Sequence, residues 1–446
     1  MHTILHRLLA AGCKPSSADV VNSAVADSLP TVVQAAGMDS AEAAATVATI
    51  FAQFDTGRSA GYSLVGTVSG LGVRSLTELD IIVKLRAMVD DKKAGLSRET
   101  ALLAIQLLAT RLGRVFEPYM AGYMKQLLVC VGETAAGVRD AAEQAAQAIA
   151  ASIAPSGASL LIAPLLEASG DKSWKKKETA LQLLTLLAQR APKQLGRQMP
   201  AVVPVLQAAL QDTHVKVSAA ASATLGAVAQ VITQPEIVKN MDVLIEALTK
   251  PDQKTAACLE KLMETTFCNP MDVSALSVVV PVVTRGLRER SAELKKIAAM
   301  TAGNIFQLVQ EARDMKPFVP VILPEVTKAV EHSHPDVRRA AERAKEKLLS
   351  GAEISDGMPE PEAKVSPVAE HVLAQLHGKV PAAVAEYVAE EAALMLEEHF
   401  VARELAEVLA PVMQGYLDAA AVSTLCVDAQ RVDRENNVHL QRFPGK

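Results

Sequence analysis

The chain has 446 residues, of which half are hydrophobic and only 3% aromatic, and its net charge is −5. This balance argues against nucleic-acid binding through bulk positive charge, and no apolar run is long enough to span a membrane. Five scattered cysteines without a C-x-x-C pair favour buried thiols in a reducing compartment, so we expect a cytoplasmic protein. Because alanine, leucine and valine fill the apolar positions, the composition indicates helices rather than strands.

The N-terminal 55 residues are rich in alanine, and apolar residues recur with helical spacing in Ala41–Phe54. Repeats follow these residues, and the first repeat of an array has an apolar face that no preceding repeat covers. We therefore expect residues 1–55 to form a helical cap.

One pattern recurs through residues 56–350: a turn with an acidic residue, then a basic residue, then a helix that opens on alanine. Eight copies align on an anchor alanine, with spacings of 37 to 42 residues: Ala60, Ala101, Ala141, Ala180, Ala219, Ala256, Ala298 and Ala340. A period of about forty residues with one helical pair in each period is typical of a helical solenoid. Such folds present a long surface to a partner.

Proline recurs in most of the helices that precede these turns, at Pro118, Pro164, Pro204, Pro281, Pro320 and Pro324. Proline in the first helix, with an acidic and then a basic residue at the turn, favours HEAT repeats over tetratricopeptide or ankyrin repeats. The second helices are apolar on more than one face, as in Gln182–Ala191, which favours stacking between repeats. The predicted fold is all-α: an armadillo-like HEAT-repeat solenoid of about eight helical pairs with a cap.

The repeat pattern stops in a stretch rich in glycine, proline and acidic residues, which predicts a linker over residues 351–367. Amphipathic segments in residues 368–430 predict a small acidic helical bundle, and residues 431–446 a polar tail. Residues 351–446 carry a net charge of −9, and the rest of the chain +4. We expect Glu390, Glu391, Glu397 and Glu398 to form a solvated face of the bundle.

Motifs for catalysis are missing from the sequence, which lacks the patterns G-x-x-x-x-G-K-[ST], G-x-G-x-x-G and H-E-x-x-H. His332 and His334 lie in a predicted turn and lack a third metal ligand nearby. We therefore expect a non-enzymatic protein with no catalytic residue, no metal site, no cofactor and no small-molecule substrate.

The best candidates for a functional site are basic repeat turns. Trp174 is the single tryptophan and is followed by Lys175, Lys176 and Lys177. An amphipathic ring beside cations on a turn is typical of a partner-binding surface, and the cations suit phosphate if the partner contains RNA. The alternative is structural, because each basic residue could pair with the turn aspartate of the neighbouring repeat in a ladder along the solenoid, and Trp174 could pack on the adjacent helix.

A second basic cluster surrounds the turn of residues 284–296 and comprises Arg285, Arg288, Arg290, Lys295 and Lys296. Its cations are denser than a ladder requires, since Glu289 and Glu293 are the acidic residues nearby. A third basic cluster, near Arg338 and Arg343, is interleaved with Glu342 and Glu346. We interpret it as a surface helix that satisfies its own charges.

At these residues the chain resembles the HEAT region shared by fungal-type translation elongation factor 3 and the large activator of the amino-acid-starvation kinase. The resemblance covers about residues 55–350 and is carried by LGRVFEPYM at Leu112–Met120, by Ala191–Leu206 and by Thr265–Ser291. The segment Tyr387–Met413 is similar to the helical bundle that follows the repeats in the elongation factor.

The resemblance implies a ribosome-binding docking scaffold in translation elongation or its control, with rRNA, ribosomal proteins and translation-control proteins as partners. Under this interpretation the two basic clusters are the contacts. The chain ends where the elongation factor has its ABC-type ATPase modules, so one alternative is the N-terminal part of such an ATPase. A tubulin-binding scaffold is the other alternative, since DKSWKKKETA at Asp171–Ala180 resembles the first repeat turn of TOG domains.

Overall fold

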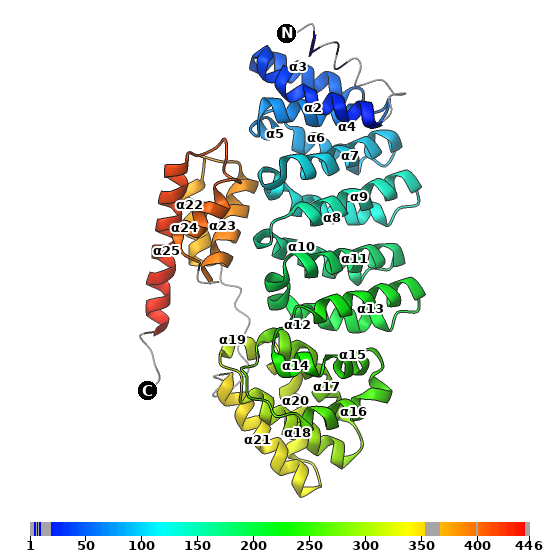
Figure 1. Cartoon of the computed structure of the whole chain (residues 1–446), viewed down its shortest axis with the longest axis vertical. Coiled ribbons are helices and arrows are strands. Elements are labelled where there is room, and N and C mark those ends of the chain that lie inside the picture. The colour runs from blue at the N-terminus through cyan, green and yellow to red at the C-terminus, as the bar shows by residue number, and fades with distance from the viewer. Residues whose placement is uncertain are drawn as a thin grey trace. The chain divides into compact units, whose positions relative to one another are not determined.

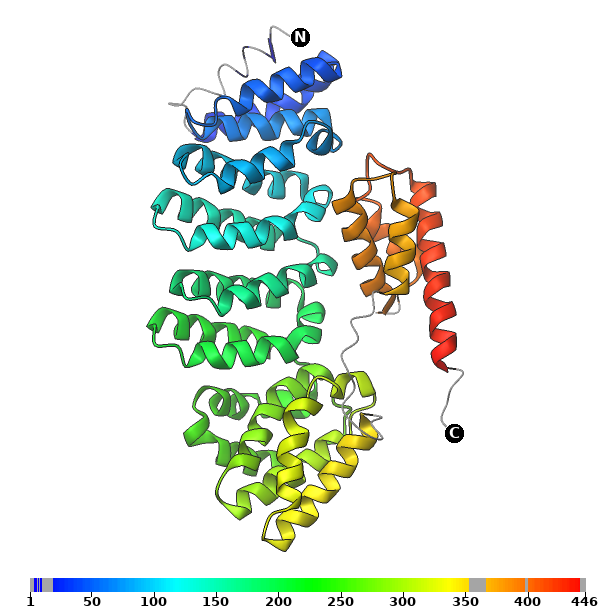
Figure 2. The same cartoon turned by 180° about the vertical axis from the view of Figure 1, so that it is seen from behind.

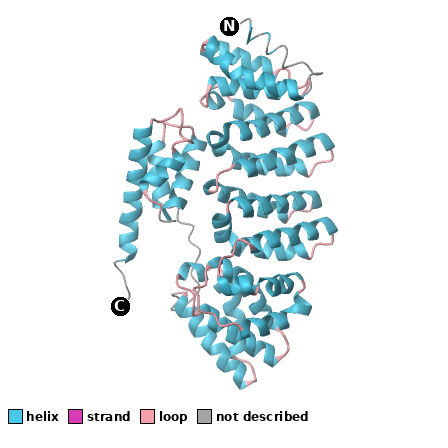
Figure 3. Ribbon diagram, viewed as in Figure 1, coloured by secondary structure: helices cyan, strands magenta, loops and turns pink. Residues whose placement is uncertain are grey.

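The computed structural model describes residues 4–5, 7, 9, 19–352, 366–397 and 400–441. In this part of the chain the regular elements are helices, with one isolated bridge between Met271 and Val309 (Figure 3). The helices form two compact units, one of Met1–Pro164 with Ala363–Lys446 and one of Leu165–Glu362. The predicted all-α repeat fold is confirmed.

Each anchor alanine lies in its own helix, and another helix precedes it (Figure 1). The anchor helices are α4 (Ser59–Leu71), α7 (Gly95–Leu112), α9 (Ala136–Ser152), α11 (Trp174–Arg190), α13 (Val215–Ala229), α16 (Pro251–Glu264), α18 (Ala292–Phe306) and α21 (Pro335–Gly351). The helices before them are α3 (Ser40–Phe51), α6 (Ile81–Asp90), α8 (Glu117–Val131), α10 (Ser159–Ser169), α12 (Pro192–Leu210), α15 (Met241–Thr249), α17 (Val273–Arg288) and α20 (Val319–Val330). The recurring prolines lie in these preceding helices, as the sequence predicts.

Helix α2 (Asp19–Ala36) begins the longer described part of the first unit and packs along α4. The approach is close because α4 has glycine at its contact points: a Cβ on Gly66 would lie 2.7 Å from the Ala26 carbonyl oxygen, and one on Gly70 would lie 2.6 Å from Val33. Asp39 caps α3 through a reciprocal pair of hydrogen bonds. Its carboxylate accepts from the backbone N–H of Glu42, and the Glu42 carboxylate accepts from the backbone N–H of Asp39. The N-terminal helices therefore cover a face of the first anchor helix.

Consecutive anchor helices pack on one another, α4 on α7 and α7 on α9 in the first unit, and α11 on α13, α16 on α18 and α18 on α21 in the second. Helix α7 illustrates how this packing buries side chains. Its side chains are buried on more than one face, including Leu102, Leu103, Ile105 and Leu108. Such a helix contacts its own partner and the next repeat together.

The C-terminal helices of the first unit are α22 (Pro367–Leu376), α23 (Ala382–Glu397), α24 (Ala402–Leu409) and α25 (Ala419–Gln441), and they pack as a bundle (Figure 2). Helix α25 continues beyond the boundary that we expected at residue 430, where the sequence predicts a polar tail. Arg431 lies 3.5 Å from both Asp428 and Glu435, one turn away on either side, and these pairs support the additional turns.

A buried polar network joins α23 to the repeats of the same unit. Glu391 is 1% exposed, accepts a hydrogen bond from Ser156, and lies 3.2 Å from an Nη of Arg114. Glu117 is fully buried, pairs with Arg114, and accepts from the Tyr387 hydroxyl at 2.6 Å. The expectation that Glu391 is solvated is therefore wrong, because its helix face packs on α8. Glu390 and Glu397 are exposed, and Glu398 lies outside the described residues.

The second unit contains one irregular repeat. Its first helix is broken into α14 (Pro235–Lys239) and α15, and α15 has 9 residues whereas the flanking α12 and α17 have 19 and 16. Helices α12 and α17 therefore pack directly against each other past the short helix. This repeat also has the shortest anchor spacing, 37 residues between Ala219 and Ala256. A short helix α19 (Ala312–Met315) precedes α20.

Candidate interaction surface

The candidate residues lie at repeat turns of the second unit. Trp174, Lys175, Lys176 and Lys177 form the first turn of α11, and the second cluster spans the end of α17 and the start of α18. Because an intra-repeat turn points away from the stacked core, these side chains are half-buried or exposed. The two groups are separate clusters on different repeats.

Trp174 is the centre of an aromatic and cationic cluster that spans two repeats. Its ring stacks on His214 of the next turn with centroids 4.2 Å apart and planes 11° from parallel. The Nζ atoms of Lys175 and Lys216 lie 5.6 and 5.1 Å from the ring centroid, within cation–π range. Trp174 therefore packs on the neighbouring repeat and also holds two lysines beside it.

Lys176 and Lys177 are both paired, but only Lys177 forms the ladder between repeats that was the structural alternative. Lys176 pairs with Asp171 of its own turn at 2.7 Å, and Lys177 pairs with Asp212 of the next turn at 2.6 Å. These hydrogen bonds are the main reason that the pKa values of the Asp171 and Asp212 carboxyls are lowered. Each aspartate also accepts a backbone N–H two residues later, so the acid orders the turn as well.

In two repeats the cation that pairs with the next turn stands three residues before the anchor alanine. In the first unit this position is Arg98, which is buried and pairs with Glu133 of the next turn at 2.7 Å. Lys177 holds the same position in its repeat. Lys216 and Lys295 do so too, but within the described residues no ion pair holds either of them. Alignment of the repeats on their anchor alanines would have singled out Arg98 and Lys216.

The second basic cluster is also partly paired. Arg285 forms an ion pair with Asp252, Arg288 Nε lies 3.1 Å from Glu325, and Lys296 lies 3.7 Å from Glu293. Arg290 is exposed, and in the described part of the chain it has no ion pair. Of this cluster, Arg290 and Lys295 thus retain unpaired charge.

The third basic cluster differs from the other two. Arg338 donates to the backbone carbonyls of His332 and Ser333, and Arg339 pairs with Asp336 at 3.1 Å. These contacts are local to one turn and its helix.

Among the described residues, no helix is long and apolar enough to cross a bilayer.

Comparisons with known proteins place the repeats in a family. Residues 57–225 match the model of the EF3 N-terminal HEAT repeat, and residues 252–358 match the elongation factor 3/GNC1 HEAT repeat. The chain is 40% identical to Protein ILITYHIA of Arabidopsis thaliana over 66% of its own length and 11% of that protein.

Two further relatives represent the two branches of the resemblance. Stalled ribosome sensor GCN1 of Mus musculus is 34% identical over 78% of this chain and 13% of the relative. Elongation factor 3 of Pneumocystis carinii is 28% identical over 62% of this chain and 27% of the relative. The chain thus spans between about a tenth and just over a quarter of the length of these relatives. Through its repeats, this chain belongs to the elongation factor 3/GCN1 HEAT-repeat family.

Proposed function

We propose that the chain is a ribosome-associated HEAT-repeat scaffold that acts in translation control by docking and not by catalysis. The proposal rests on a surplus of positive charge at repeat turns, meaning cations that are not neutralised by the ion pairs between repeats. The relatives of this chain include a stalled ribosome sensor and an elongation factor. Around Trp174 and at the turn of residues 284–296, that surplus includes Lys175, Lys216, Arg290 and Lys295, for which the described residues supply no ion pair.

Phosphate is the ligand that this surplus suits best. Lys175 and Lys216 are held beside the Trp174 ring, so their ammonium groups are partly positioned before a partner arrives. Lysine binds phosphate as a point charge, and releases counterions from the nucleic acid when it does so. Ribosomal RNA and the proteins bound to it are therefore the proposed partners. The tubulin alternative depends on the single turn Asp171–Ala180, and the Trp174 ring of that turn is stacked on His214.

Ribosome co-sedimentation of a charge-reversed variant tests the proposal. The variant combines Lys175→Glu, Lys216→Glu, Arg290→Glu and Lys295→Glu. We expect its ribosome affinity to fall about tenfold or more. The dependence of affinity on salt should become shallower by about one unit of slope for each phosphate that the variant no longer neutralises.

A matched control reverses four other exposed cations of the same unit: Arg190, Lys239, Lys261 and Arg343. It changes the net charge equally and should bind ribosomes nearly as well as the wild type. Circular dichroism checks that both variants keep their helices. If the two variants lose affinity equally, or if neither loses any, these turns are not the docking site.

A further inference from the structure

The turn between α17 and α18 carries an exposed serine that the proposed ribosome contact does not use. Ser291 precedes α18, and its hydroxyl accepts a hydrogen bond from the backbone N–H of Leu294 at 3.4 Å, which is long for such a bond. The backbone is extended at Glu289 (φ −59°, ψ 158°) and again at Ser291 (φ −70°, ψ 123°). An exposed, extended segment can enter the cleft of an enzyme without the loss of helical hydrogen bonds.

Arginine precedes Ser291 at three positions. Arg285, Arg288 and Arg290 stand six, three and one residues before it. Serine/threonine kinases of the basophilic class select an arginine three residues before the acceptor, because carboxylates in their clefts bind the guanidinium group. The turn therefore has the charge pattern that this class of enzyme recognises.

Thr77 is the other serine or threonine in the sequence with an arginine three residues before it, and it differs from Ser291 in structure. It lies within α5 (Ser75–Glu78), and its hydroxyl donates to the Arg74 carbonyl at 3.1 Å. The Arg74 side chain in turn donates to the Gly415 carbonyl. At Ser291 the pattern coincides with an extended, exposed turn, so Thr77 is a natural control.

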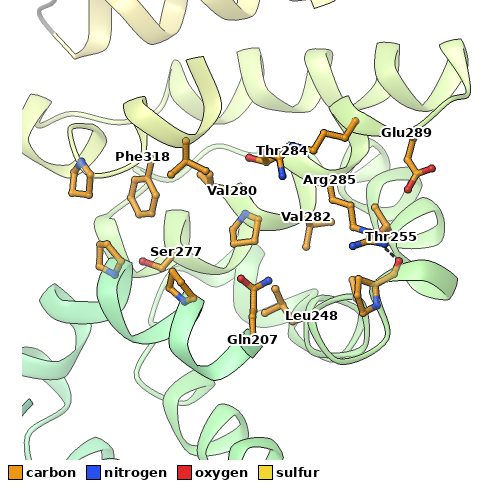
Figure 4. Close-up of a pocket in the computed structure, with 18 of the residues that line it drawn as sticks. Gln207, Leu248, Thr255, Ser277, Val280, Val282, Thr284, Arg285, Glu289 and Phe318 are labelled. Carbon is orange, nitrogen blue, oxygen red and sulfur yellow. Dashed lines mark hydrogen bonds between the residues drawn. The ribbon is translucent and has the colours of Figure 1, made fainter. Parts of the chain in front are cut away.

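The arginines before Ser291 are within reach of such an enzyme. Arg285, Arg288 and Glu289 line one end of a groove of about 700 Å³ beside α17, which forms where the short α15 leaves space (Figure 4). The Arg288 side chain is 60% exposed. Its partner Glu325 keeps a second cation, Lys328 at 3.1 Å, when Arg288 turns away. Release of so exposed an arginine therefore costs little stability.

A phosphate on Ser291 would join the two cations of this cluster that retain unpaired charge. Arg290 is the preceding residue, and Lys295 lies one turn into α18, where its backbone N–H donates to the Ser291 carbonyl at 3.1 Å. Residues 284–296 contain five cations and two carboxylates, a net charge of +3. A phosphoserine adds about −1.5 to −2 charges at neutral pH and three acceptor oxygens, so it removes half or more of this surplus.

We propose that Ser291 is a phosphorylation site for a basophilic serine/threonine kinase, and that its phosphate pairs with Arg290 and Lys295. In the reaction a bond forms between the Ser291 Oγ and the γ-phosphorus of ATP, and the bond from that phosphorus to the β–γ bridging oxygen breaks. ADP leaves, and the hydroxyl proton passes to the catalytic aspartate of the kinase. The modification withdraws positive charge from the docking turn, and this regulatory role rests on the proposed function.

Labelling of the purified full chain tests the site. The probe is a recombinant kinase that requires arginine three residues before serine, supplied with ATP, and mass spectrometry of peptic fragments locates the phosphate. We expect phosphate on Ser291 and none on Thr77. The rate should fall about tenfold or more in Arg288→Lys, because lysine keeps the charge but lacks the planar fork. Ser291→Asn should abolish the label while it retains a residue that caps α18.

A synthetic peptide of residues 284–296 is the control for recognition of the sequence. If the kinase labels this peptide but leaves Ser291 of the folded chain unmodified, the turn does not present the serine and the inference is wrong.

Phosphorus NMR of the labelled chain as a function of pH tests the pairing. Cations beside a phosphate favour its dianion, so Arg290→Gln with Lys295→Gln should raise the pKa of the phosphate. Arg190→Gln with Lys261→Gln changes the net charge equally at exposed, distant sites and should leave that pKa unchanged. Equal effects of the two double variants would refute the pairing.

Ribosome co-sedimentation separates this inference from the proposed function. The phosphorylated chain should bind ribosomes about fivefold or more weakly than the unmodified chain, and kinase treatment should not weaken Ser291→Asn. If the four-residue charge reversal lowers ribosome affinity and phosphorylation does not, the regulatory role is wrong and the proposed function stands. If neither change lowers it, the proposed function fails, and labelling and NMR still decide whether Ser291 is modified and paired.

Discussion

At the scale of single residues, the position three residues before the anchor alanine is buried in one unit and half-buried in the other. Arg98 is 3% exposed, donates through Nε to the Val89 carbonyl at 2.8 Å, and pairs with both oxygens of Glu133. Hydrogen bonding to Arg98 is the largest reason that the pKa of Glu133 is lowered. Lys177 makes a single pair from a half-buried position. The planar guanidinium serves several acceptors, which an ammonium group cannot do in the same geometry.

Substitution of Arg98 tests this difference. We expect Arg98→Ala to lower the free energy of unfolding by about 3 kcal/mol, because the Val89 carbonyl and the Glu133 carboxylate lose their buried partner. Lys177→Ala should cost about 1 kcal/mol or less. Chemical denaturation followed by circular dichroism measures both, with the exposed Arg190→Ala as control. Equal losses of stability for Arg98→Ala and Lys177→Ala would contradict the assignment.

At the scale of elements, the bundle is held to the repeats of its unit by a polar network in which charges do not balance. Arg114 faces two buried carboxyls, Glu117 and Glu391. Both oxygens of Glu117 accept hydrogen bonds, from Ala154, Tyr387 and Arg114, whereas Oε2 of Glu391 is buried without a partner among the described residues. Burial raises the pKa of Glu391, against the opposing effect of Arg114. The neutral acid is thus the form of Glu391 that suits the site.

The sign of the resulting pH dependence follows from the raised pKa. A carboxyl whose pKa is higher in the folded state stabilises the fold at low pH, and this contribution is lost as the pH rises through the folded pKa. Glu391→Gln keeps the shape of the neutral acid but cannot ionise. We therefore expect the stability of this variant relative to wild type to be greater at pH 8 than at pH 5. Thermal unfolding across this range measures it, with the exposed Glu397→Gln as control. A constant difference between Glu391→Gln and wild type would refute the idea.

Glycine at one position makes this docking possible. A Cβ on Gly157 would lie 2.4 Å from the Tyr387 hydroxyl oxygen, so a larger residue would push α23 away from the repeats of its unit. Glu117 and Arg114 lie in the LGRVFEPYM segment, whereas Tyr387 and Glu391 lie in the bundle segment. The contact therefore joins a repeat segment that lies within the family match to the C-terminal bundle.

At the scale of the whole molecule, the chain consists of two compact units, and the first unit combines the N-terminal repeats with the C-terminal bundle. Repeats contact their neighbours along the row, so stability is transmitted locally from one repeat to the next. Local damage should therefore remain within the unit that contains it.

Hydrogen exchange of Arg98→Ala tests this expectation. Amide protection should fall in α6–α9, which surround Arg98, and should stay at its wild-type level in α17–α21 of the second unit. Mass spectrometry of peptic fragments resolves the two regions. A uniform loss of protection along the chain would show that the two units unfold as one.

Much of the fold follows from the sequence alone because its signals are local. The acidic turn residue, the basic residue after it and the anchor alanine lie within a few positions of one another, so eight helices could be predicted from the pattern. The prolines at Pro118, Pro204 and Pro281 likewise mark first helices by their own geometry. The family resemblance is visible for the same reason, since its motifs are contiguous.

Only the tertiary structure decided which charges are paired, because the partners are far apart in the sequence. Lys177 meets an aspartate 35 positions away, and Glu391 meets Arg114 across 277 positions, so neither burial nor pairing can be deduced from neighbours. The groove arises from a helix that is too short, an effect of relative helix lengths in three dimensions. By itself the sequence determined a stacked helical repeat protein with basic turns, and the packing of those repeats decided which turns remain available to a partner.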